Sequence, residues 1–164
     1  MTVIAFDPYF DEQFALANNI EAVELNELLR RSDFVTLHLA LTKSTRHLID
    51  ANALSLMRPD AYLINTSRGG IVDEIALAEA VQRNLIAGAG LDVFESEPLE
   101  MDSVLRGQPR ILTTGHIAGA TREARSKSGI QAAQTVVSIL QGNAVTNAVN
   151  LPQVGEHENE RGTK

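Results

Sequence analysis

Three residues of the 164-residue sequence have side chains suited to acid–base chemistry on a small organic acid: Arg68, Glu97 and His116. The planar guanidinium of an arginine can bind a carboxylate through two parallel hydrogen bonds. Histidine exchanges protons near neutral pH, and a neighbouring glutamate would stabilise its charged form and fix its tautomer. Each residue alone has an ordinary interpretation, as a turn arginine, a turn glutamate or a loop histidine. Together they predict proton and hydride transfer on a small hydroxy acid.

These residues lie far apart in the sequence, so secondary structure must bring them together. Short apolar runs predict strands at residues 3–6, 20–23, 33–41, 61–67, 86–94 and 110–114. Segments with helical spacing predict helices at 11–18, 24–31, 50–57, 73–84 and 121–141, with Asp50 and Asp73 as N-caps. Because strands that alternate with helices imply parallel crossovers, the sequence predicts an α/β fold with a doubly wound, mostly parallel sheet.

Ligands of such sheets bind outside the carboxyl ends of the strands, so the residues that follow each strand are the candidates for a binding site. The residues in these places are Asp7, His38, Thr66, Ser67, Arg68, Asp92, Glu95, Glu97, Thr114, His116 and Gly119. We interpret His38 as a structural residue or a loose lining of a cofactor site. No role is assigned to His47 or His157.

Asp7 follows the first apolar run and precedes Pro8. It has two interpretations at this point. It ends the strand and starts a turn, which is a common position for aspartate. Alternatively, it is the carboxylate that binds the adenosine ribose at the end of a strand in a dinucleotide-binding fold.

Composition excludes several classes of protein. The sequence contains no cysteine, so it has no disulfide framework and no cysteine metal site, and we expect no metal. The net charge of −7 opposes broad binding to nucleic acid. Neither a signal peptide nor a membrane span is recognisable, so we expect a cytoplasmic protein. We expect one domain at residues 1–150 and a polar, disordered tail at 151–164.

Longer segments of the sequence resemble a known family. The D-isomer-specific 2-hydroxyacid dehydrogenases have three consecutive signature segments, which are similar to INTSRGGIVDEIALAEAV, AGAGLDVFESEP and TTGHIAGATREA. The segment that precedes them in the family is similar to FVTLHLALTKSTRHLI. Two segments, the opening VIAFDPY and the closing NAVTNAVNLP, most resemble the phosphoglycerate dehydrogenase branch of the family. The resemblance covers residues 2–152.

The resemblance implies a role for each candidate residue. Arg68 would hold the substrate carboxylate and carbonyl oxygen, His116 would be the acid–base group, and Glu97 would be its partner. Asp7 would bind the adenosine ribose and favour NAD over NADP, because it repels the 2′-phosphate. The residues on the nicotinamide side of the cofactor would be Thr66, Ser67, Arg68, Asp92, His116, Ala118 and Gly119.

The sequence also departs from the family. Ala40 and Gly115 stand where the family has proline, which would loosen two turns. The sequence contains no G-x-G-x-x-G phosphate-binding turn, and the strand that precedes this turn in the family is absent. We therefore expect a partial NAD-binding Rossmann domain that lacks its first strand. That strand lies between the second and fourth in the order 3-2-1-4-5-6, so two sheet edges should be unpaired.

Two hypotheses on function remain open. The chain is part of an NAD-dependent dehydrogenase that interconverts a 2-hydroxy acid, with 3-phosphoglycerate as one candidate, and its 2-oxo acid. A homodimer is expected, and an N-terminal segment supplied in trans would complete the fold. The alternative is a catalytically inactive remnant, or a nucleotide-binding or dimerising module. Another Rossmann-like enzyme such as a methyltransferase fits the sheet but not the order of Arg68, Glu97 and His116.

Overall fold

The computed structural model describes residues 1–145. The chain divides into two compact units, Met1–Ala118 and Gly119–Lys164. The predicted tail at 151–164 lies outside the described residues, and the predicted boundary at residue 150 stays a prediction.

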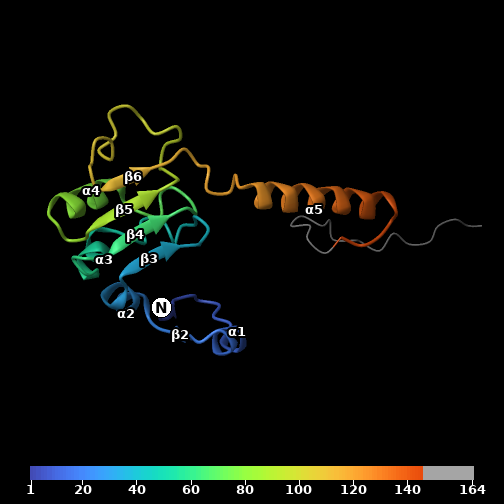
Figure 1. Cartoon of the computed structure of the whole chain (residues 1–164), viewed down its shortest axis with the longest axis horizontal. Helices are drawn as coiled ribbons and strands as arrows, with labels where there is room; N and C mark the ends of the chain where they lie inside the picture. The colour runs from blue at the N-terminus through green and yellow to red at the C-terminus, as the bar shows by residue number, and fades with distance from the viewer. Residues whose placement is uncertain (146–164) are drawn as a thin grey trace, which may run out of the picture. The chain divides into compact units, whose positions relative to one another are not determined.

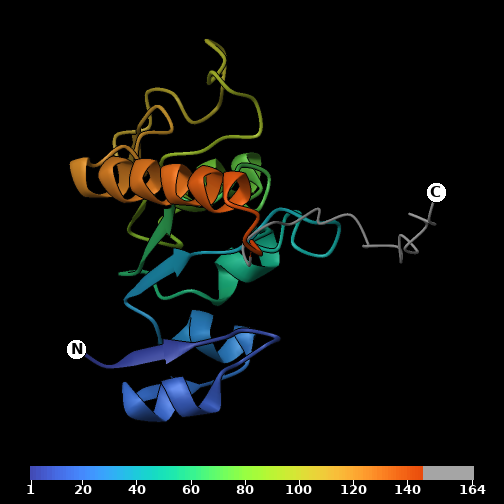
Figure 2. The same ribbon diagram turned by 90° about the vertical axis from the view of Figure 1, so that its right-hand side faces the viewer.

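The first unit begins with a small parallel sheet. Strands β1 (Val3–Ala5) and β2 (Ile20–Ala22) pair in parallel and are connected by helix α1 (Glu12–Ala17). Asp11 caps α1 by accepting a hydrogen bond from the Phe14 N–H, which satisfies one of the free amides of the first turn. Helix α2 (Leu25–Arg31) follows β2. The two helices lie on opposite sides of the strand pair (Figure 1 and Figure 2).

The larger sheet has four parallel strands in sequence order. They are β3 (Phe34–Leu37), β4 (Tyr62–Asn65), β5 (Gly88–Leu91) and β6 (Ile111–Thr113) (Figure 1). Helix α3 (Ala51–Leu56) connects β3 to β4 and helix α4 (Glu74–Gln82) connects β4 to β5, with Asp50 and Asp73 as their N-caps. The predicted α/β fold with parallel strands is confirmed.

The observed strands are shorter than the apolar runs that predicted them. The run at 33–41 gives only Phe34–Leu37, so His38 lies beyond the end of β3 and its Nε2 is 2.9 Å from the Thr36 hydroxyl. Pairing with the neighbouring strand decides where a strand ends: β4 matches β3 residue for residue from Tyr62 to Asn65.

The hydrophobic core lies on one face of the larger sheet. Val35, Leu63 and Leu91 of the strands are buried together with Leu54 and Leu77 of α3 and α4. The alternation of buried and exposed residues along β3 and β4 reflects the period of two in a strand.

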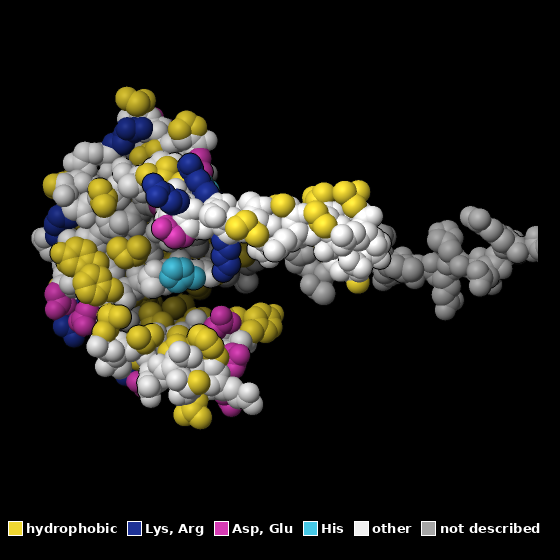
Figure 3. Space-filling view, turned by 45° about the vertical axis from the view of Figure 1, so that its right-hand side comes forward, with side chains coloured by type: hydrophobic (Ala, Val, Ile, Leu, Met, Phe, Trp, Pro, Cys, Tyr) yellow, Lys and Arg dark blue, Asp and Glu magenta, His cyan; other side chains and the backbone are white. Residues whose placement is uncertain are grey.

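The opposite face of this sheet is exposed. The Phe34 and Tyr62 rings stack on it with centroids 5.7 Å apart, and Leu112 is 70% exposed. Figure 3 shows apolar side chains, in yellow, exposed in several places on the surface of the first unit. Within residues 1–118, helices α3 and α4 therefore pack on the buried face of the sheet, and neither covers the exposed face.

Strands β1 and β3 belong to separate sheets, and each pairs with a single neighbour. In the predicted strand order, one more strand lies between these two. Residues 1–145 supply no strand at that position. The observed pairing agrees with the expectation of two unpaired edges.

The second unit contains one long helix among its described residues, α5 (Arg122–Leu140). The Thr121 side chain caps its N-terminus by accepting a hydrogen bond from the Ala124 N–H. Gly142 follows the helix at a φ of +74°, a backbone angle that glycine adopts without strain. The predicted helix at 121–141 is confirmed. Within the described part of the chain, no helix is long and apolar enough to cross a membrane.

Candidate active site

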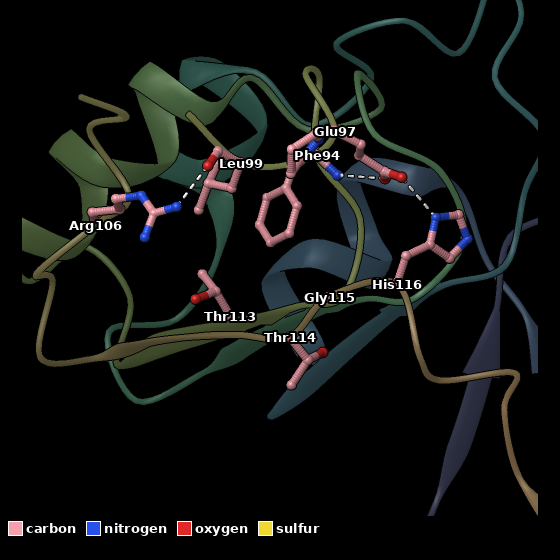
Figure 4. Close-up of a pocket in the computed structure, with 9 residues that line it drawn as sticks. Phe94, Glu97, Leu99, Arg106, Thr113, Thr114, Gly115 and His116 are labelled. Carbon is pink, nitrogen blue, oxygen red and sulfur yellow. Dashed lines mark hydrogen bonds and ion pairs between the residues drawn. The ribbon is translucent and has the colours of Figure 1, made fainter. Parts of the chain in front are cut away.

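A histidine–carboxylate pair lies just beyond the carboxyl end of β6. The Nδ1 atom of His116 is 2.8 Å from Oε2 of Glu97, and the two side chains point toward each other in Figure 4. Glu97 Oε1 accepts a second hydrogen bond from the Phe94 N–H at 3.1 Å. The hydrogen bonds from His116 and from Phe94 lower the pKa of Glu97. The carboxyl group is therefore ionised at neutral pH.

The ionised carboxylate decides which ring nitrogen of His116 carries the proton. A carboxylate can only accept a hydrogen bond, so the contact requires a proton on Nδ1. In the neutral imidazole this leaves Nε2 as an acceptor. The His116 side chain is 51% exposed, so an external ligand can reach it. The pair can thus take up and release a proton at a defined atom.

The backbone of His116 has a φ of 56°, in the left-handed region. Residues other than glycine rarely adopt this conformation, although histidine does so more often than most. The His116 N–H donates to the Asp92 carbonyl oxygen at 2.8 Å, which holds the residue in place.

The side chain of Asp92 is buried beneath this loop, with 3% of the residue exposed. Its carboxylate accepts hydrogen bonds from the Thr114 hydroxyl, from the Ile117 N–H at 2.9 Å and from the Ala118 N–H at 2.7 Å. Burial raises the pKa of Asp92, but these three hydrogen bonds outweigh it and place the pKa below its ordinary value. Asp92 thus anchors residues 114–118, although Gly115 replaces the proline of the family. The predicted contact of Asp92 with a cofactor stays a prediction.

A second loop begins at the end of β4 and carries Arg68. Asn65 is buried and organises this loop: its Oδ1 accepts from the Ser67 N–H and hydroxyl at 3.0 and 2.8 Å, and its Nδ2 donates to the Arg68 carbonyl at 2.9 Å. Arg68 is exposed, as is Thr66. Asn65 was not among the residues expected at the site. Its place directly after an apolar strand and before Thr-Ser was the available signal, because asparagine in that place forms a turn with its own backbone.

The two loops are in contact. A Cβ atom on Gly69 would lie 1.7 Å from the Phe94 carbonyl oxygen, so only glycine allows the backbones to approach so closely. The fold therefore places the loop that carries Arg68 directly against the segment that leads to Glu97.

A cavity of about 570 Å³ lies beside the histidine–carboxylate pair. Figure 4 shows its wall, with the Phe94 ring turned toward Thr113 and Thr114. Arg106 lines the far side and donates to the Leu99 carbonyl at 2.6 Å. Ligand pockets of small molecules have volumes of roughly 300–1,000 Å³, so the cavity is large enough for a small organic acid.

Asp7 lies just beyond the end of β1, and its Oδ1 accepts a hydrogen bond from the Tyr9 N–H at 2.7 Å. The turn interpretation thus has a direct structural basis. The same side chain is exposed, so it can also accept hydrogen bonds from a ligand.

The chemistry of the exposed groups fits part of a dinucleotide. A carboxylate after β1 suits a ribose diol, and the hydroxyl groups after β4 suit polar groups at the other end of the cofactor. Gly119 begins the second unit, and a Cβ there would meet open space. The sequence has no G-x-G-x-x-G turn for the pyrophosphate. Residues 1–145 contain no cluster of side chains suited to a metal ion.

A parallel α/β sheet with polar residues at the carboxyl ends of its strands is the architecture of dinucleotide-binding domains. The histidine–carboxylate pair lies beside that edge. The chain belongs to the D-isomer-specific 2-hydroxyacid dehydrogenase family: the family's NAD-binding domain matches residues 1–118.

Relatives of known activity support this assignment. The chain is 38% identical over 159 residues to the D-3-phosphoglycerate dehydrogenase of Methanocaldococcus jannaschii, covering 96% of this chain and 30% of that protein. It is 48% identical over 128 residues to the (S)-sulfolactate dehydrogenase of Chromohalobacter salexigens, covering 77% of this chain and 41% of that protein. The chain thus spans less than half the length of these relatives.

The fold is shared with solved structures. One is the NAD-complexed D-isomer-specific 2-hydroxyacid dehydrogenase of Lactobacillus delbrueckii subspecies bulgaricus, with a TM-score of 0.80 and 29% sequence identity. The match covers 91% of this chain and 49% of that one.

Proposed function

We propose that this chain is the NAD-binding, acid–base part of a dehydrogenase that interconverts a 2-hydroxy acid and its 2-oxo acid. The observation that carries the proposal is the contact of 2.8 Å between His116 and Glu97 beyond the end of β6. The membership of the family and the NAD complex of a structural relative support NAD as the cofactor.

In this proposal His116 takes the hydroxyl proton of the substrate on Nε2 during oxidation and returns it during reduction. Glu97 keeps the proton on Nδ1 and stabilises the imidazolium that forms. Arg68 binds the substrate carboxylate with its planar guanidinium, which is exposed at the end of β4. When bound, NAD supplies the acceptor for the hydride from C2 of the substrate.

The substrate class is the 2-hydroxy acids, with 3-phosphoglycerate as one candidate. The relatives named above act on 3-phosphoglycerate and sulfolactate. Each of these acids carries a second anionic group beside the hydroxy acid. We also propose a homodimer in the cytoplasm, by analogy with the family, and light scattering of the purified chain tests the dimer.

A second candidate function is a nucleotide-binding or dimerising module without turnover. The 164 residues contain no G-x-G-x-x-G turn to present backbone N–H groups to the pyrophosphate, so this candidate predicts weak dinucleotide binding by these residues alone. NADH titration followed by fluorescence measures the effect. Dissociation constants well above the low micromolar range are expected for the chain alone.

Turnover distinguishes the two functions. NADH oxidation by the purified chain is followed with a panel of 2-oxo acids, including phosphooxypyruvate and sulfopyruvate. His116→Asn, which tolerates the left-handed backbone, should lower the rate about 10²–10⁴-fold. Arg68→Ala should abolish measurable turnover, whereas Arg58→Ala, which removes a surface arginine paired with Asp60, should not. Turnover that survives Arg68→Ala would refute the assigned role, and no turnover with any acid would favour the second candidate.

A further inference from the structure

Glu95 is held by residues from two other parts of the first unit. Its Oε1 is 2.9 Å from Nε2 of His47, and its Oε2 accepts a hydrogen bond from Arg46 at 3.3 Å. Its backbone N–H donates to Oε1 of Glu74, in the first turn of α4, at 2.7 Å. Both the side chain and the backbone of this residue are therefore fixed.

Glu95 lies in the short segment that carries the carboxylate partner of His116. Phe94 is buried, and its N–H donates to the Glu97 side chain at 3.1 Å. The Glu97 carboxylate therefore contacts both the backbone N–H of Phe94, three residues earlier, and the His116 ring at 2.8 Å. Only Ser96 separates Glu95 from Glu97, so we expect a movement of Glu95 to shift the Glu97 carboxylate.

His47 is itself tied to the loop that carries Arg68. Its backbone N–H donates to the Gly70 carbonyl at 2.8 Å. The neighbouring Gly69 is pressed against the Phe94 carbonyl. The contact between His47 and Glu95 thus joins the Arg68 loop to the Glu97 segment by a side-chain bond, next to a close backbone contact.

The backbone of His47 limits which residues can replace it. Its φ of 49° lies in the left-handed region, where glycine is the unstrained residue. The side chains of His47 and Glu95 are 36% and 32% exposed, and pairs this accessible to water contribute little to stability. The pair therefore contributes more to the geometry of these two loops than to the stability of the fold.

We propose that His47 and Glu95 are positioning residues that hold the Glu97 carboxylate in line with Nδ1 of His116. The inference rests on the proposed function in taking Glu97 and His116 as the acid–base pair. Neither His47 nor Glu95 touches the reacting atoms in this proposal. A displacement of about 1 Å in a catalytic group can lower a rate about 10²-fold, so even a small loss of positioning is measurable.

The test follows the imidazole nitrogens of His116 in the full 164-residue chain, labelled with ¹⁵N. Long-range ¹H–¹⁵N spectra report which nitrogen carries the proton and whether Nδ1–H is hydrogen-bonded. His47→Asn keeps a residue that tolerates the left-handed backbone but is too short to reach Glu95. Glu95→Ala removes the other partner and keeps the backbone bond to Glu74. Glu97→Gln defines the spectrum of a broken pair.

His47→Asn, Glu95→Ala and the double variant should each move the His116 Nδ1 resonance toward its Glu97→Gln value. Because Glu95→Ala also removes the contact with Arg46, it should move the resonance at least as far as His47→Asn does, and the double variant should move it no further than Glu95→Ala alone. The matched control is Glu21→Ala, which breaks an exposed ion pair with Arg31 and should leave His116 unchanged. If only Glu97→Gln moves the resonance, the positioning role is overturned and the proposed function stands. If Glu97→Gln leaves it unchanged as well, both are overturned.

Discussion

Replacing Asp92 by asparagine tests how the loop that carries His116 is held. The carboxylate lies in a buried site where two backbone amides and one hydroxyl donate to it. Asparagine has the same shape but only one accepting oxygen. If this oxygen faces Thr114 and Ile117, the amide NH₂ faces the Ala118 N–H, at a site where the present contact is 2.7 Å. Two donors then oppose each other.

The magnitude follows from this arrangement. A hydrogen bond to a charged group contributes about 1.5–3 kcal/mol, and a buried donor left without a partner costs about 1–3 kcal/mol. The remaining two hydrogen bonds would also be made to a neutral acceptor and not to a charged one. Asp92→Asn should therefore lower the free energy of unfolding by about 3 kcal/mol. For a unit of this size that corresponds to a fall in Tm of roughly 10 °C.

Urea unfolding followed by far-ultraviolet circular dichroism measures the change, because the sequence has no tryptophan to report by fluorescence. Asp60→Asn is the matched control: it changes an exposed aspartate that pairs with Arg58 and should alter stability little. The Asp92 pKa is lower in the folded state than in the unfolded chain. Its contribution is therefore fully present above the unfolded pKa, near 4, and lost as the pH falls through the folded pKa. A deficit of less than about 0.5 kcal/mol at pH 7 would refute this account of the loop.

Two further predictions concern the surroundings of the site. Gly69→Ala should destabilise the fold by about 3 kcal/mol or more, because the added Cβ would overlap the Phe94 carbonyl. The control is Gly115→Ala. Its Cβ would meet open space, so it should change stability by no more than about 0.5 kcal/mol. Equal effects in thermal unfolding would contradict the close contact of the two loops. Burial, followed by the charges of Glu95 and Asp73, raises the pKa of Glu74, so its ionisation costs stability as the pH rises above the unfolded value. The free energy of unfolding of Glu74→Gln, measured by urea titration, should therefore rise relative to that of the wild-type protein between pH 4 and pH 7. A difference between the two free energies that does not change with pH would argue against that burial.

Local sequence patterns predicted most of the fold. Asp11, Asp50, Asp73 and Thr121 lie at the starts of helices, where their side chains accept hydrogen bonds from free backbone amides. These interactions span three residues, so they can be read directly from the sequence. The ends of the strands could not be predicted from the sequence, because a strand ends where its partner stops pairing, and that partner is distant in the sequence.

The candidate site divides in the same way. The types and order of Arg68, Glu97 and His116 gave the chemistry, and the family resemblance gave their expected roles. Glu97 and His116 are in contact, and the roles of the three residues stay predictions. Asn65 and His47 were not predicted as parts of the site. Asn65 had a local signal in its turn, whereas His47 meets a residue 48 positions away and had none.

The sequence by itself determined the alternating strands and helices, the parallel sheet and the set of polar residues at its edge. Only the tertiary structure decided that Gly69 lies against Phe94, that the Asp92 carboxylate holds the His116 loop, and that His47 contacts Glu95. The physical reason is the separation in sequence over which each kind of interaction acts. Propensities and caps act over a few residues, whereas the position of a carboxylate depends on which distant backbones pack against it.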